Sequence, residues 1–426
     1  MSSIWLLMGL LVLSYAGSFL VGRRGVGGGL PASTEYVVLG FVLGPGALGL
    51  VQRSTLAVME PVAHAALGWL AFVLGLQYGI NHGRRVRTVR VIASWTGGLL
   101  TGGVIAAAVY GVLRLAAPAG TLDERDRLLI AGGVGASTAE TSRDVVRWAV
   151  HRGRAAGRLT DLVGDLAHSD DLAPLLAAAS LFALSAERDV ETAHQPAWVW
   201  LTVTLGLGAL LGGMTAVLLG RTFRLAEAWS VMLGMSMLAI GTASRLGLAS
   251  VAAMFVMGTA VSALSPHRAD LTAMITPTER PVMLPALLLA GAGVDFTSAR
   301  WLPWVIAAAL AARLVAKQLV GLAVLAVAPS ARPSGPRLGL GLSSAGALSV
   351  GIGLTFALRF PGPVGGAALA AAAVAAVVGE MVGPASLRAC LRRAGEIQEA
   401  VEPAPPVTPL VLMDTPEPPP AEAPAS

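Results

Sequence analysis

The sequence predicts an all-α polytopic membrane protein. Of its 426 residues, 55% are hydrophobic and only 13% are charged, and the mean hydropathy is +0.70. Soluble domains are about 25% charged on average. Apolar runs of about 20 residues, the length that crosses a bilayer as a helix, recur along almost the whole chain. The high pI of about 10.1 therefore reflects arginines between membrane spans, and it implies no nucleic-acid partner.

The apolar runs predict 13 transmembrane helices, at 3–21, 34–51, 61–80, 91–113, 128–148, 162–185, 196–219, 228–243, 246–264, 281–296, 301–327, 337–358 and 365–386. In the first run the charges of Arg23 and Arg24 follow the apolar core. A cleaved signal peptide carries its charges before the core, so this pattern favours an uncleaved first helix over cleavage.

Arginines are distributed unequally between the connections. Loops after odd-numbered spans contain most of them, for example at 84–90, 152–158 and 388–393, whereas loops after even-numbered spans contain fewer. Because arginine-rich loops stay in the cytoplasm, the N-terminus is expected outside and the C-terminus in the cytoplasm. An odd number of spans follows from that orientation.

Six spans, a linking seventh and six more would place the two halves of the chain in opposite orientations. This arrangement is the inverted-repeat plan of many secondary transporters. Residues 1–394 are expected to form this membrane domain. Residues 395–426 are rich in proline and alanine and are acidic, which predicts a disordered cytoplasmic tail.

Lys317 is the single lysine of the chain, and it lies inside the apolar run at 301–327. A lysine can lose its charge when it is buried, whereas an arginine cannot. A genome that favours arginine codons would explain why lysine is scarce. It would not explain why the one lysine lies at membrane depth, where charge is costly and usually functional.

Two adjacent acids, Asp170 and Asp171, lie within the sixth predicted span. Counted from the predicted cytoplasmic ends at a rise of 1.5 Å per residue, Asp170 and Lys317 both lie roughly 12 to 15 Å deep, so we expect them to meet. Neighbouring helical residues point about 100° apart, so only one acid can face the lysine. The other is expected to face a cavity and bind a cation. The alternative is a structural ion pair that locks two helices.

Other polar residues surround this pair of acids. The fifth and twelfth spans contain the glycine- and serine-rich stretches GGVGASTAETS and GLGLSSAGALSVGIG, which can be unwound around an ion site or can be small-residue packing surfaces. Arg313, one turn from Lys317, is expected either to neutralise a second acid or to have a structural role. Asp165 is expected to belong to an acidic mouth on the cytoplasmic side, together with Asp161 and His168. A role for His168 as a pH sensor is the alternative to a solvated histidine at a loop end, which is the favoured interpretation.

Two further expectations concern the remaining ionisable residues. Glu140 and Asp144 are expected at the cytoplasmic end of the fifth span, with Arg143 and Arg147 as partners. The histidines lack the spacing of a zinc site.

These motifs resemble the bacterial monovalent cation:proton antiporter family, which includes sodium/proton exchangers and Kef-type proteins. The resemblance covers nearly all of 1–394 and is carried in order by GFVLGPGALGL at 40–50, ASTA at 136–139, SDDLAPLL, LAGAGVDF, RLVAKQLVG and EMVGPASLRACLRRAGE. It implies a fold with two crossed broken helices in a bacterial inner membrane, with dimerisation as a family expectation.

The resemblance also implies roles for residues. Asp171 would bind the transported monovalent cation or a proton, and Asp170 would be the partner of Lys317. Four residues would lie where the broken helices cross: Ser137, Thr138, Ser344 and Gly346.

The function that follows is exchange of Na⁺ or K⁺ for protons by alternating access, without a cofactor. A cation-coupled transporter of a small organic ion and a non-transporting sensor on the same fold are the alternatives. An intramembrane aspartyl protease is disfavoured, because its acids lie on separate helices in a GxGD element, and Leu162 stands where the first glycine belongs. We therefore do not expect an enzyme.

Overall fold

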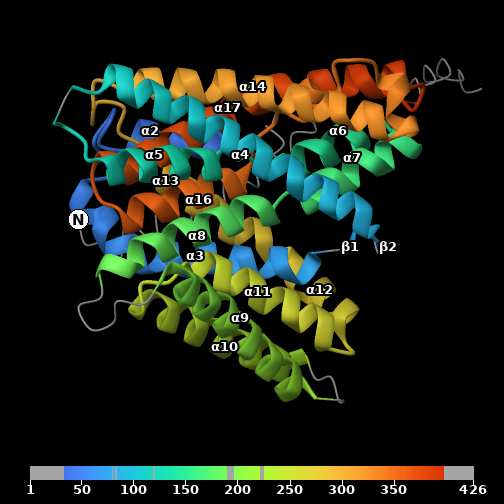
Figure 1. Cartoon of the computed structure of the whole chain (residues 1–426). Helices are drawn as coiled ribbons and strands as arrows, with labels where there is room; N and C mark the ends of the chain where they lie inside the picture. Colours follow the sequence, from blue (N-terminus) through green and yellow to red (C-terminus); the bar gives the residue numbers. More distant parts are fainter. Residues whose placement is uncertain are drawn as a thin grey trace, which may run out of the picture.

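The computed structural model describes residues 33–397 apart from 79, 82–83, 119, 190–195 and 221–224. The first predicted span, at 3–21, and nearly all of the predicted tail lie outside the described residues. Within them the chain is helical except for irregular connections and one small hairpin, in which β1 (Ile80–Asn81) pairs antiparallel with β2 (Arg84–Arg85). Most of the long helices run along a common axis (Figure 1).

Every predicted span from the second onward contains one or more helices. In chain order these are α2 (Glu35–Leu43), α3 (Arg53–Gln77), α4 (Thr88–Ala116), α5 (Glu124–Ser137), α6 (Arg143–Arg152), α7 (Arg158–Ser169), α8 (Leu172–Asp189), α9 (Ala197–Leu219), α10 (Leu225–Arg245), α11 (Ser250–Leu264), α12 (Arg268–Ile275), η1 (Thr276–Thr278), α13 (Glu279–Gly293), α14 (Leu302–Val327), η2 (Pro329–Ser334), α15 (Leu338–Gly341), α16 (Ala347–Arg359) and α17 (Pro363–Arg393).

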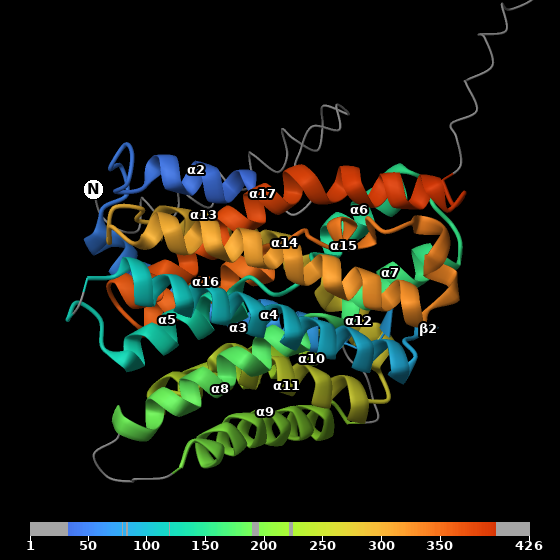
Figure 2. The same cartoon turned by 45° about the horizontal axis from the view of Figure 1, so that its top comes forward.

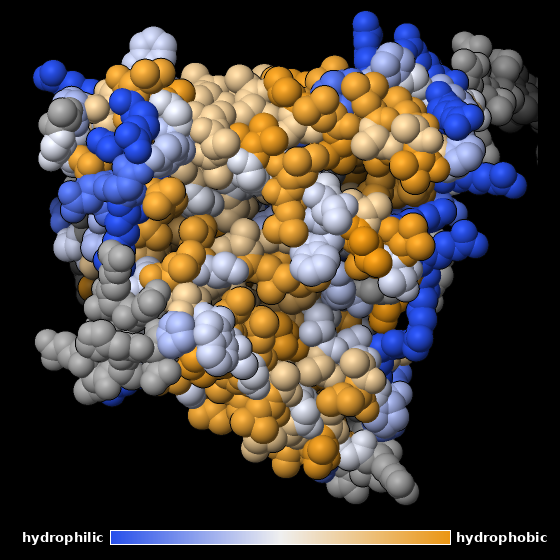
Figure 3. All heavy atoms as spheres, in the orientation of Figure 1, coloured by the Kyte–Doolittle hydropathy of each residue, from blue (hydrophilic) through white to orange (hydrophobic). Residues whose placement is uncertain are grey.

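The helices have the length and composition of membrane spans. In the described part of the chain, five are both long and apolar enough to cross a bilayer: α3, α4, α9, α14 and α17. On the face shown in Figure 3, hydrophilic residues gather at the two ends of the molecule, and apolar residues form the surface between them. The prediction of an all-α, multi-pass membrane protein is therefore confirmed.

Glycines allow close packing in two pairs of helices. Each pair joins one helix from the first half of the chain to one from the second half. α2 packs on α13 through Gly40 and Gly291, and α3 packs on α11 through Gly75 and Gly258. At each glycine a Cβ atom would come within 2.0 to 2.2 Å of a backbone oxygen of the facing helix, so only glycine fits. The second predicted span thus packs on the tenth, and the third on the ninth, as an inverted repeat requires.

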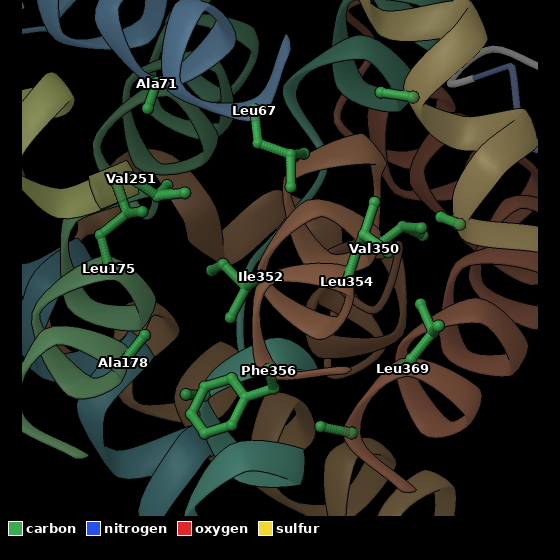
Figure 4. Close-up of a cluster of buried hydrophobic side chains, with 14 of the residues drawn as sticks. Leu67, Ala71, Leu175, Ala178, Val251, Val350, Ile352, Leu354, Phe356 and Leu369 are labelled. Carbon is green, nitrogen blue, oxygen red and sulfur yellow. The ribbon is translucent and has the colours of Figure 1, made fainter. Parts of the chain in front are cut away.

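Around these contacts the helices form two groups. α9, α10 and α11 lie together on one side of the molecule with α3, while α4, α14 and α17 lie on the other (Figures 1 and 2). α16 runs between the groups, and its apolar residues pack against α3, α8 and α17. Figure 4 shows this cluster, in which Phe356 of α16 lies near Ala178 of α8, and Val350 lies near Leu67 of α3.

Three spans that the apolar runs predict as single helices are interrupted. The fifth is divided into α5 and α6, the sixth into α7 and α8, and the twelfth into α15 and α16. The breaks in the fifth and twelfth spans confirm the two broken helices that the family resemblance implies. The prediction of a continuous sixth helix was wrong: α7 ends at Ser169, and α8 begins at Leu172.

The break in the sixth span has a local cause. Pro174 lies in the first turn of α8, where a residue without a backbone N–H is tolerated, whereas inside a continuous helix it would clash with the preceding turn. Asp170 and Asp171 therefore lie in a joint between two helices, with backbone groups free of the regular helical pattern.

Candidate functional site

The two broken helices cross at the centre of the molecule. Residues 138–142 and 342–346 form the non-helical segments, and the backbone N–H of Ser142 donates to the carbonyl of Ser344 at 2.9 Å. The hydroxyl of Thr141 donates to the carbonyl of Leu342 at 3.1 Å. Where a helix is interrupted, some backbone N–H and carbonyl groups lose their helical partners. Each segment provides hydrogen-bond partners for such groups of the other, because unpaired backbone groups are costly in a low-dielectric interior.

Glu140 fixes this crossing. Its side chain is buried, and Oε1 accepts the backbone N–H of Gly346 at 2.7 Å, at the N-terminus of α16. A carboxylate is favoured there by the positive end of the helix dipole. Arg313 of α14 donates to the backbone carbonyl of Glu140 at 2.6 Å and to that of Ser343 at 3.2 Å, so one buried guanidinium binds both segments.

The predicted crossing residues all lie in or beside these segments, with different contacts. Ser137 ends α5, and its hydroxyl lies 3.3 Å from the carbonyl of Ala368, while the hydroxyl of Thr138 donates back to Val134 at 2.6 Å. Ser344 contributes its carbonyl to the crossing. Its buried hydroxyl has no hydrogen-bond partner among the described residues.

Lys317 contacts Asp170 as the depth estimate predicts. Its Nζ lies 3.0 Å from Oδ2 of Asp170 and donates to Oγ1 of Thr141 at 2.8 Å. Both charged side chains are buried. The lysine therefore joins α14 to the joint between α7 and α8 and to the first crossing segment.

Asp171 borders an inner pocket, as the sequence analysis expects of the second acid, and its carboxylate is paired with an arginine there. Nε of Arg143, the first residue of α6, lies 3.1 Å from Oδ2 of Asp171. The same guanidinium lies 3.6 Å from Oε1 of Glu279 and 3.2 Å from Oε1 of Gln77. Arg143 thus links the crossing to α13 and α3.

Two hollows meet at Arg143. An inner pocket is lined by Glu140, Arg143, Asp171, Glu279 and apolar residues of α3 and α16. A larger cavity of about 750 Å³, which we call the vestibule, is lined among others by Gln77, Arg143, Arg147, Asp161, His168 and Arg268. Arg143 lines both, and in the inner pocket its guanidinium pairs with Asp171.

The acids of the site do not form a resident metal centre. Among the described residues, no group of three or more histidine, cysteine or carboxylate side chains is close enough to hold a metal ion. A cation that reached Asp171 would need neutral oxygen ligands as well. Hydroxyl and carbonyl groups of the crossing segments are of the type that such an ion takes.

Comparisons with known proteins agree with this geometry. The family model for the transmembrane region of sodium/hydrogen exchangers matches residues 9–393. The chain belongs to this family. Its fold is similar to that of the sodium proton antiporter MjNhaP1 from Methanocaldococcus jannaschii at pH 8, with a TM-score of 0.70 at 15% identity over 92% of this chain and 99% of that one.

A second structure of MjNhaP1, from electron microscopy, gives a TM-score of 0.65 at 15% identity over 93% of this chain and 99% of that one. A comparison with curated proteins finds no match. The predicted family and the predicted fold are therefore confirmed.

Asp165 does not form an acidic mouth in this exchanger-family chain. Its side chain is fully buried, and Oδ2 lies 2.5 Å from Nη1 of Arg90 on α4. The prediction was wrong because α4 packs across α7, and a charge buried between helices needs a partner. His168 is likewise buried and not solvated, with Nε2 2.8 Å from the carbonyl of Gln77. Asp161 does line the vestibule.

The sequence analysis also misplaced Glu140 and Arg143. It expected both at the cytoplasmic end of a continuous helix, with arginines as local partners of the acids. Only Arg147 and Asp144 pair in that way, at 2.8 Å. The available signal was the position of Glu140 among small residues in an apolar span, which is the same signal that singled out Asp170 and Asp171. No pattern in the sequence around Arg143 indicated that Glu279 or Gln77 would be its partners.

Proposed function

We propose that the protein exchanges a monovalent cation, Na⁺ or K⁺, for protons across the membrane by alternating access. The observation that carries this proposal is Asp171, a buried carboxylate at a helix joint that borders the inner pocket and pairs with Arg143, a residue that also lines the vestibule. A carboxylate in such a place can hold either a proton or a cation. Competition between the two for one oxygen pair couples their movements.

Asp170 and Lys317 have a different role in this proposal. Their ion pair joins α14 to the joint that contains Asp171. When the binding site changes its access from one side of the membrane to the other, the pair breaks and re-forms. A lysine suits this role because it can give up its charge while it is unpaired, whereas an arginine keeps a charge that a buried site must then stabilise.

The membership in the sodium/hydrogen exchanger family supports this assignment. We further propose that the protein lies in a bacterial inner membrane as a homodimer, with the vestibule open to the cytoplasm. The arginines at 152–158 support that orientation, because they directly follow His151, which lines the vestibule.

The test is transport by everted membrane vesicles that contain the full chain. Addition of Na⁺ or K⁺ should release protons from acidified vesicles, detected by recovery of acridine-orange fluorescence. Asp171→Asn should abolish this signal, because an amide can neither take up a proton nor balance a cation. Asp123→Asn is the matched control, since this exposed acid precedes α5 and asparagine caps a helix equally well.

The outcomes separate the alternatives. Exchange that persists unchanged in Asp171→Asn contradicts the assignment of this residue. Absence of any cation-dependent proton movement in the unmodified protein favours a non-transporting sensor. Cation uptake without counter-movement of protons favours cation-coupled transport of an organic ion. Titration with Na⁺, K⁺ and Li⁺ identifies the transported ion.

A further inference from the structure

The guanidinium of Arg143 lies against Asp171, the carboxylate to which the proposed function assigns the transported cation. It lies within 3.6 Å of carboxylate oxygens from two separate elements, Asp171 in the joint between α7 and α8 and Glu279 at the start of α13. The side chain of Arg143 is only 10% exposed, although the residue borders the vestibule. Its charge is permanent, since guanidinium does not titrate in proteins.

The local structure does not favour an arginine at this position. Arg143 is the first residue of α6, and a cation at the N-terminus of a helix is opposed by the helix dipole. The neighbouring Ser142 caps this helix, accepting the N–H of Val145 at 3.4 Å. The helix therefore starts well without Arg143, and the interactions that favour the guanidinium come from tertiary neighbours.

The charges around the crossing leave a deficit of one positive charge. The charged side chains at the crossing and in the Arg143 cluster are four acids and three basic groups: Glu140, Asp170, Asp171, Glu279, Arg143, Arg313 and Lys317. One monovalent cation or one proton completes the balance. While Arg143 lies against Asp171, however, the guanidinium competes with the incoming ion for Oδ2 of that carboxylate.

We propose that Arg143 is a tethered competitor that sets the affinity for the transported cation, with Glu279 as its alternative partner. In the empty site the guanidinium lies on Asp171. When a cation enters from the vestibule, the guanidinium moves fully onto Glu279 and uncovers Asp171. Glu279 suits this exchange, because it begins α13 and lies beside the same guanidinium already. The inference rests on the proposed function, since it assigns the cation to Asp171.

The test measures the cation concentration that gives half-maximal exchange in everted vesicles at fixed pH. Arg143→Gln removes the competitor and should lower this concentration roughly tenfold, a typical size for coupling between two ligands. Glu279→Gln leaves Asp171 as the only carboxylate for the guanidinium and should raise it to a similar extent. The double variant should behave like Arg143→Gln, because Glu279 acts only through Arg143.

Arg127→Gln is the matched control. This arginine is similarly shielded, at 17% side-chain exposure, and pairs with Glu124 at 3.3 Å in the first turn of α5, on the opposite side of the crossing. Its removal should leave the half-maximal concentration unchanged. Arg143→Lys keeps a positive charge and should lie closer to the unmodified protein, which provides a second variant if the glutamine variant fails to fold.

Chemical complementation provides an independent readout. Guanidinium chloride at millimolar concentration should inhibit Arg143→Gln competitively with the cation, because the free ion can occupy the vacated place. It should inhibit the unmodified protein much less. Urea has a similar shape but no charge, and it should inhibit neither.

The results distinguish failure of the Arg143 proposal from failure of the proposed exchange function. If Asp171→Asn abolishes exchange but Arg143→Gln leaves the half-maximal concentration unchanged, Arg143 is not a competitor. The same conclusion follows if Arg143→Gln and Glu279→Gln shift it in the same direction. If exchange survives Asp171→Asn, the proposed function itself fails, whatever Arg143 does.

Discussion

At the scale of single residues, the centre of this protein consists of charges that stabilise one another. Lys317 and Asp170 are 3% and 6% exposed at the side chain and lie 3.0 Å apart. Removing a charge from such a pair leaves its partner unpaired in a low-dielectric interior, and that penalty exceeds the net gain from forming the pair. The two residues should therefore behave as one unit when they are replaced.

We predict that Lys317→Met destabilises the folded protein by about 3 to 5 kcal/mol, because Asp170 remains charged and unpaired. Combining Lys317→Met with Asp170→Asn should recover most of this loss. Thermal unfolding of the detergent-purified protein measures both effects. Arg114→Gln, which breaks an exposed pair with Glu124, is the control and should leave the unfolding temperature unchanged. Losses that simply add in the double variant would contradict the coupling.

These residues differ in how far the sequence could predict them. Lys317 and the two aspartates are visible because a charge inside an apolar run is itself unusual. Glu140 and Arg143 were misread because each has an oppositely charged neighbour one turn away in the sequence, which offers a local partner for its charge. Their actual partners, Gly346 and Glu279, are more than a hundred positions distant, and only the folded chain brings them close.

At the scale of elements, the site depends on membrane spans whose helices are interrupted. The glycine- and serine-rich stretches of the fifth and twelfth spans were compatible with two structures, a tightly packed helix and an unwound segment. What selects the unwound form is the crossing, in which Ser142 bonds to Ser344 and Glu140 bonds to Gly346. Each segment provides hydrogen-bond partners for the backbone groups that unwinding frees in the other. The sequence of one segment alone therefore could not show whether it is helical or unwound.

We predict that Gly346→Ala disrupts this crossing. A Cβ atom at this position would lie 2.5 Å from Oγ and 2.9 Å from Cβ of Ser142, so the two segments must separate. We expect a loss of about 1 to 3 kcal/mol in unfolding free energy, as for other overpacked sites, together with reduced exchange. Both are measurable on purified protein and in vesicles.

Two comparisons test the cause of that loss. Gly103→Ala in α4 adds the same methyl group where no other atom lies within 4 Å, and it should not destabilise the protein. Adding Ser142→Ala to Gly346→Ala removes the nearest clashing atom and should restore part of the stability. If Gly346→Ala is as stable as Gly103→Ala, the close approach is not important for the crossing.

At the scale of the whole molecule, the two halves pack reciprocally, although their sequences show no strong similarity. Gly40 and Gly291 join one pair of helices, and Gly75 and Gly258 join the corresponding pair. The number of spans and the arginine distribution were sufficient to predict this plan, because bilayer thickness fixes span length and charge fixes orientation. The reciprocal contacts could not be predicted, since small residues occur throughout these helices.

The orientation of the molecule gives the last prediction, since the vestibule opens at the end that carries the arginines at 152–158. Cys390 is the single cysteine and is buried, so Cys390→Ser gives a background without reactive thiols. In it, Ser298→Cys and Ala156→Cys place one exposed thiol in the loop between α13 and α14 and one between α6 and α7. A membrane-impermeant maleimide should label Ser298→Cys in intact cells and Ala156→Cys only after the membrane is opened. The reverse pattern would place the vestibule outside, and Arg143 would then control entry of the cation from the external solution.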